Sequence, residues 1–150
     1  MWYASRGRRS DVETCEAEMP VTMEICEAGH VLRFVYTDPW TLPDMLAFYP
    51  ASDAYFTRAP HRVHTLCRYD ARQIPLGVLQ LRHGAPSLVH PNSGHLIVVS
   101  SGIALRAIVG VVFRIANYDR GKFFDTEEEA LAFLRQVIAS ETGVSQHRGG

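Results

Sequence analysis

An unbroken apolar stretch in the second half of the chain limits the possible folds more than any other feature. Residues 94–100 read GHLIVVS, and a second apolar segment, IALRAIVGVVFRI, covers 103–115. A short run of consecutive apolar residues is typical of a strand that is covered on both faces of a sheet. The longer segment predicts a helix that is apolar nearly all round and therefore deeply packed. Together they predict a strand–helix unit inside an α/β domain.

Shorter patterns predict the other strands. Apolar residues alternate with polar ones over 21–36, which predicts an antiparallel hairpin that turns at Gly29. The same alternation over 61–69 predicts a third strand. The segment GKFF, at 121–124, predicts a short last strand.

Caps and prolines mark three further helices. Thr41 begins the first, which should kink or break at Pro50. A second is predicted over 75–84, between a proline and a glycine. The segment 125–140 predicts the third, with Thr126 in a capping box and three glutamates interpreted as a solvated first turn that complements the helix dipole.

The order of these elements predicts an α/β fold with a mixed sheet of four or five strands. An N-terminal antiparallel hairpin would be followed by parallel strands, joined by right-handed crossovers, and by about four helices. A chain of 150 residues, 47% of them hydrophobic, corresponds to one domain, assigned to 20–141 between a flexible leader (1–19) and a flexible tail (142–150). Trp40 and Phe113 are expected in its core.

Composition excludes several classes. A net charge of -1 supplies no concentrated basic surface, so neither nucleic acid nor a membrane surface is expected as a partner. Arginines interrupt the apolar stretch and argue against a membrane span. Cys15, Cys26 and Cys67 are few, odd in number and without CxxC spacing, which indicates neither a disulfide framework nor a zinc site and fits a reducing cytoplasm.

Four segments resemble the STAS/SpoIIAA-like family, the fold of the anti-sigma-factor antagonists. They are YTDPWT, RYDARQIPLGVLQLR, HPNSGHLIVVSSGIALRAIVGVVFRI and FFDTEEEALAFL, and the resemblance covers about Met23 to Ile138. It implies a STAS-like fold and a small cytoplasmic switch or scaffold that binds other proteins. The family's regulatory serine lies in the loop after the third strand.

That loop differs from the family pattern in this chain. It reads DARQIPLG and contains neither serine nor threonine, so the phosphoserine switch is not expected, and only its first residue matches the family. A polar rim around a small apolar patch is suited to a modest protein interface. The candidate partner-binding residues are therefore Asp70, Arg72, Gln73, Ile74 and Leu76. The alternative is an ordinary connector whose apolar residues hold the next helix.

Ser100, Ser101 and Gly102 join the central strand to its helix. Small residues and hydroxyls at such a junction cap the helix and allow a tight turn. The carboxyl end of a central strand is also where open α/β sheets contact anions and ligands, so a weak ligand contact stays open. Neither GxSxG nor a GKS/T phosphate loop is present, and no catalytic residue is assigned.

The seven histidines raise the question of a metal site. His61 and His64 are three apart on a predicted strand and should face opposite sides. His83, His90 and His95 lie in or beside one predicted loop and could converge on a metal. Ordinary surface or turn positions are the favoured interpretation. No metal and no cofactor are expected.

The sequence thus favours a non-enzymatic, cytoplasmic protein-interaction or regulatory domain. Its expected partner is another protein, and a homodimer stays open. Two alternatives remain. One is a small-ligand or lipid-binding domain of the same fold, with a pocket between the sheet and the helices near Ser101 and Asp70. The other is a small metal-dependent enzyme that uses the histidine-rich loop.

Overall fold

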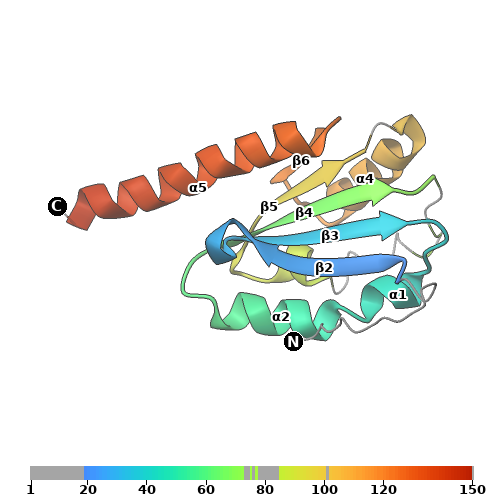
Figure 1. Cartoon of the computed structure of the whole chain (residues 1–150), viewed down its shortest axis with the longest axis horizontal. Helices are drawn as coiled ribbons and strands as arrows, with labels where there is room; N and C mark the ends of the chain where they lie inside the picture. The colour runs from blue at the N-terminus through green and yellow to red at the C-terminus, as the bar shows by residue number, and fades with distance from the viewer. Residues whose placement is uncertain (1–18, 73–74, 76, 78–84, 101, 150) are drawn as a thin grey trace, which may run out of the picture.

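A single mixed sheet organises the computed structural model, which describes residues 19–72, 75, 77, 85–100 and 102–149 (Figure 1). The strands lie in the order β2-β3-β4-β5-β6. The first two are antiparallel and the others are parallel. Their bounds are β2 Val21–Cys26, β3 Val31–Thr37, β4 Val63–Asp70, β5 Ser93–Val99 and β6 Gly121–Phe124. This confirms the predicted α/β class and the N-terminal hairpin, whose turn contains Gly29 at a φ of 93°.

The helices form a layer on each face of the sheet. They are α1 Leu42–Leu46, α2 Tyr49–Arg58, α3 Pro86–Val89, α4 Ile103–Ile115 and α5 Glu127–Gly149, with a short 3-10 turn, η2, at Glu27–Gly29. Right-handed crossovers between strands that follow one another in the sheet place all connecting helices on one face. Accordingly α1 and α2 lie on one side and α5 lies on the other (Figure 1).

Alternate residues of the inner strands supply two cores. On the face of α1–α4 the core includes Leu32 and Phe34 of β3, Cys67 of β4 and Val98 of β5. On the face of α5 the core consists of Val31, Leu66, Ile97, Val99, Ala130 and Leu134. Consecutive β5 residues therefore contact opposite helical layers, as the unbroken apolar run predicts.

The predicted start of the first helix is confirmed in detail. The Thr41 hydroxyl accepts a hydrogen bond from the Asp44 N–H, and the Asp44 carboxylate accepts one from the Thr41 N–H. The helix then breaks, and Pro50 lies in the first turn of α2, where its missing N–H leaves no bond unmade. Trp40 is buried, as expected, with its ring 4.8 Å from that of Tyr36.

Helix α4 corrects one expectation. Leu105, Val109 and Phe113 are buried against the sheet, but Ile103 is 86% exposed and Ile115 is 47% exposed. The prediction of a helix packed nearly all round is therefore wrong, because the described residues supply a packing partner on its sheet side only. No helix in the described part of the chain combines the length and the apolarity needed to cross a bilayer.

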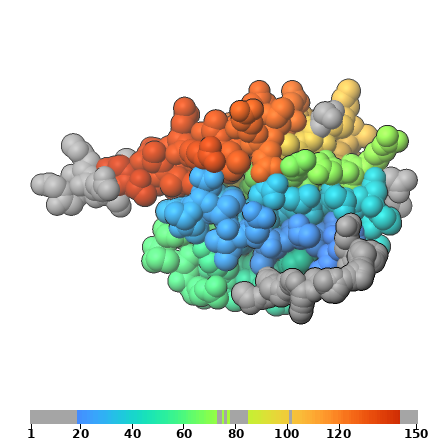
Figure 2. All heavy atoms as spheres, in the orientation of Figure 1, coloured from blue at the N-terminus to red at the C-terminus, as the bar shows by residue number. Residues whose placement is uncertain are grey.

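Helix α5 begins as predicted and extends further. The Thr126 hydroxyl accepts a hydrogen bond from the Glu129 N–H, at 3.2 Å. The helix continues to Gly149, through residues predicted as a tail. Its C-terminal part projects beyond the sheet (Figure 1), and α5 stands out from the body of the molecule in Figure 2. The helix predicted over 75–84 falls almost entirely outside the described residues.

Truncation of Phe113 should leave a cavity in the larger core. Its side chain is 7% exposed, and its ring lies 5.6 Å from that of Tyr118 and 5.8 Å from that of Phe123. We expect Phe113→Ala to lower the free energy of unfolding by about 3–5 kcal/mol, measured by urea denaturation. The control is Ile115→Ala on the same helix, which should cost far less. Equal losses for the two variants would contradict this packing of α4.

Candidate functional site

The carboxyl ends of the parallel strands enclose a polar cleft of about 320 Å³. In open α/β sheets, ligands bind at this edge, because strand ends and helix N-termini meet there. The cleft is lined by Arg68, Tyr69, Asp70, Val99, Ser100, Asp125, Thr126 and Glu127. It therefore brings together two of the regions predicted from the sequence, the start of the loop after β4 and the junction after β5.

Ser100 makes local contacts in this cleft. Its hydroxyl accepts a hydrogen bond from the Gly102 N–H at 3.1 Å, and its carbonyl accepts one from Arg106 Nε at 2.7 Å. Gly102 is the N-cap residue of α4, with no side-chain cap bond. Ser100 thus stabilises the turn into α4, whereas Ser101 lies outside the described residues.

A charge network forms one wall of the cleft. Glu127 accepts hydrogen bonds from Arg33 Nε at 2.6 Å, Arg33 Nη2 at 2.9 Å and Arg68 Nη1 at 3.0 Å. Hydrogen bonds from Arg33, opposed by partial burial, lower the pKa of the Glu127 carboxyl, and Arg68 adds to this effect. The interpretation of all three glutamates as solvated is therefore wrong for Glu127, which connects the start of α5 to β3 and β4.

The other charges lining the cleft are also paired. Arg68 Nε donates to Asp70 Oδ1 at 3.0 Å. Arg106 Nη2 donates to Asp125 Oδ1 at 2.6 Å, and its guanidinium lies 5.7 Å from the centre of the Phe123 ring. The first pair lies within β4, whereas the second connects α4 to the residue that follows β6.

The candidate partner-binding loop is described only in part. Asp70 is exposed, and the Arg72 N–H donates to Asp38 Oδ2 at 2.8 Å, which ties this loop to the one after β3. Gln73, Ile74 and Leu76 lie outside the described residues.

Sequence reasoning missed a histidine cluster at the opposite edge of the sheet, where the parallel strands begin. The rings of His30 and His61 are stacked with their centres 3.9 Å apart. The rings of His64 and His95 are 5.5 Å apart, and His64 Nε2 lies 3.1 Å from Glu141 Oε1 of α5. A signal existed, because His64 and His95 stand two residues before Leu66 and Ile97, which face α5, and residues two apart in a strand share a face.

The structure separates the histidines that the sequence grouped together. His90 stacks on Phe56 of α2, at 5.3 Å, whereas His95 contacts Phe133 of α5, so the two lie toward opposite faces. His83 lies outside the described residues. Within the described residues, no group of three or more histidines, cysteines or carboxylates could hold a metal ion.

Backbone contacts fix the orientation of His64. Its Nδ1 accepts a hydrogen bond from the His95 N–H at 2.9 Å, so the neutral ring carries its proton on Nε2, facing Glu141. Gly94 allows this arrangement, because a Cβ there would lie 2.3 Å from His64 Nδ1.

The two described cysteines are unreactive by environment. Burial, the largest cause, raises the pKa of the Cys26 thiol to about 11 and that of Cys67 to about 12. Both are free and stay protonated near neutral pH.

In comparisons with known proteins, no family model, no curated protein and no solved structure matches this chain.

Removal of the Glu127 charge should destabilise the protein and reduce its sensitivity to acid. A carboxyl whose pKa in the folded state lies below its ordinary value of 4.5 stabilises above that value, and this contribution is lost as the pH falls through the lowered pKa. We expect Glu127→Gln to lower the free energy of unfolding at neutral pH by about 1–3 kcal/mol. The loss should shrink below about pH 4.5 in urea titrations. Glu128→Gln, at the exposed neighbour, is the control, and an equal effect there would contradict the assigned network.

Protonation of the histidine cluster in acid should also lower the free energy of unfolding. Burial, the largest cause, lowers the pKa of His30 and His95 below 6.5, and neighbouring histidines add to it. Such groups bind fewer protons in the folded state, so their contribution is complete above about pH 6.5 and is lost as the pH falls toward the lowered pKa. We expect the free energy of unfolding to decrease from about pH 7 to 5, less steeply in His95→Gln than in the wild type. His90→Gln, on the other face, is the control, and identical slopes in all three proteins would contradict this assignment.

Proposed function

We propose that this chain is a non-enzymatic regulatory domain that binds another protein at the carboxyl edge of its parallel strands. The observation that carries the proposal is the combination of the polar cleft with Ile103. Ile103 has the most exposed large apolar side chain among the described residues, and it directly follows Gly102, the N-cap residue of α4. An apolar contact surrounded by polar groups is the usual anatomy of a protein interface.

The rim of the cleft supplies both charges for such an interface. The Asp125 side chain is 74% exposed and that of Asp70 is 40% exposed, whereas the guanidinium-bearing side chain of Arg106 is 30% exposed. Asp70 and Asp125 can therefore form ion pairs with basic groups of a partner. The arginines that now pair with them would not become buried unpaired charges, because their side chains stay in contact with water.

The contacts in the cleft favour binding over catalysis. The Ser100 hydroxyl hydrogen-bonds with a backbone N–H, whereas an activated nucleophile needs a neighbouring general base. The Glu127 carboxyl accepts hydrogen bonds from Arg33 that lower its pKa, whereas a general acid needs a raised pKa. The resemblance to STAS/SpoIIAA-like domains and the reducing environment suggested by the cysteines complete the proposal of a cytoplasmic module that works without the family's phosphoserine.

The test maps the binding edge on the intact protein. A photo-reactive amino acid is placed at residue 103 and, as a control, at residue 115, the other exposed isoleucine position of α4. Cells are irradiated, and cross-linked proteins are identified by mass spectrometry. We expect one defined partner from residue 103 and none from residue 115. A cross-link to a second copy of the chain would identify a homodimer at this edge.

Variants then measure the contribution of each side chain. With the purified partner, Ile103→Ser, Asp70→Ala and Arg72→Ala should each weaken binding at least about fivefold, while Ile115→Ser should not. All four should change stability by only about 0.5 kcal/mol, because the side chains are exposed. Wild-type affinity in the three edge variants, or control of binding by phosphate on Ser100 or Ser101, would overturn the proposal.

A further inference from the structure

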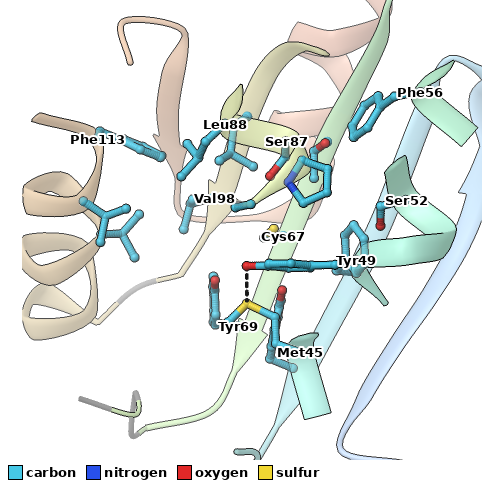
Figure 3. A pocket seen from close by; sticks show the side chains of 18 residues that line it. Met45, Tyr49, Ser52, Phe56, Cys67, Tyr69, Ser87, Leu88, Val98 and Phe113 are labelled. Atoms are coloured by element: carbon cyan, nitrogen blue, oxygen red, sulfur yellow. Dashed lines mark hydrogen bonds between the residues drawn. The ribbon is translucent and has the colours of Figure 1, made fainter. Parts of the chain in front are cut away.

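A second cavity, of about 70 Å³, lies between the sheet and the layer of α1–α4 (Figure 3). It differs from the polar cleft, which lies at the strand ends, although Tyr69 lines both. Figure 3 shows two tyrosines near Met45 at one end of the cavity, and apolar side chains toward α4 at the other. The labelled residues at these ends are Tyr49 and Tyr69, and Leu88, Val98 and Phe113.

The walls of this cavity favour an uncharged occupant. Aspartate, glutamate, lysine, arginine and histidine are all absent from the described residues that line it. Burial, the largest cause in each case, raises the pKa of the Cys67 thiol to about 12 and raises the pKa values of the Tyr49 and Tyr69 hydroxyls. A charged ligand would lose its hydration here and gain no opposite charge.

One polar group in the wall has no hydrogen-bond partner among the described residues. The Thr65 side chain is fully buried, lines the cavity and leaves its Oγ1 without a hydrogen bond. The neighbouring hydroxyls are engaged, since Ser52 donates to the Phe48 carbonyl at 2.8 Å and Tyr49 lies 4.0 Å from the Met45 sulfur. A buried hydroxyl without a partner is costly, and a ligand that supplies the partner recovers this cost.

We propose that this cavity binds an uncharged organic molecule of about four non-hydrogen atoms, a small alcohol, ketone or aldehyde, whose oxygen hydrogen-bonds with Thr65. The volume sets the size, since a cavity of roughly 150 Å³ holds benzene and one water needs only about 10–15 Å³. Water fits poorly, because each molecule needs about two to four polar partners and most of this wall is apolar or already hydrogen-bonded. The site is independent of the partner-binding edge, so either proposal can fail alone.

The test uses three probes of equal size, each with four non-hydrogen atoms: acetone, propan-2-ol and acetate. The full chain is labelled at valine and leucine methyl groups, and NMR shifts are followed during titration. We expect acetone and propan-2-ol to cause saturable shifts, with millimolar Kd values, at Leu96, Val98, Val109 and Val112, because so small a ligand makes few contacts. Acetate should cause none there, because its charge is not compensated.

Two variants identify the binding determinants. Thr65→Val keeps the side-chain shape and should fold at least as stably as the wild type, since the lost hydroxyl has no partner, but should bind acetone at least threefold more weakly. Val98→Ile adds a methyl group to the wall and should abolish the saturable shifts. If the wild type shows no saturable shifts at these methyl groups, the cavity holds only water or nothing, and the proposal is overturned. Equal acetone affinity in Thr65→Val, or equal binding of acetate, would overturn it as well.

Discussion

Burial of the inner strands on both faces is the constraint on which the structure depends. In β5, Leu96 and Val98 face the layer of α1–α4, while Ile97 and Val99 face α5. Neither face can be left to solvent without exposing half of these side chains, so the chain needs a helix on each side. The sequential strand order assigns the crossover helices to one face, and α5, which follows the last strand, covers the other.

The polar residues are distributed according to the same geometry. Strand ends cannot be fully covered by helices, so charges gather at the carboxyl edge, around Glu127, and histidines gather at the amino edge, around His64. Hydrogen bonds from each of these two clusters connect α5 to the sheet, one at the carboxyl edge through Glu127 and one at the amino edge through Glu141. Between these two contacts, Ala130 and Leu134 of α5 pack against the sheet. The carboxyl edge keeps exposed charged side chains, and the cavity lies under α1–α4, where α3 contributes Pro86, Ser87 and Leu88 to its wall.

Local patterns predicted most of the secondary structure. The capping box at Thr41, the interrupting Pro50 and the apolar run of β5 act within a few residues, so their consequences can be read without knowing the neighbours. The candidate sites were harder. Asp70 and Ser100 were selected for different reasons, one from a family resemblance and one from its place after a strand, and only the ligand-binding alternative put the two segments beside one pocket.

The sequence by itself therefore determined the fold class, the hairpin, the order of strands and helices and the burial of Trp40 and Phe113, because periodicity and caps are local properties. The tertiary structure alone decided that Glu127 binds Arg33, 94 positions away, that His64 meets Glu141, 77 positions away, and that α4 leaves Ile103 exposed. It also left the Thr65 hydroxyl facing no partner. These features depend on strand register and on how helices sit on the sheet, and such long-range distances are not encoded in the pattern of any single segment.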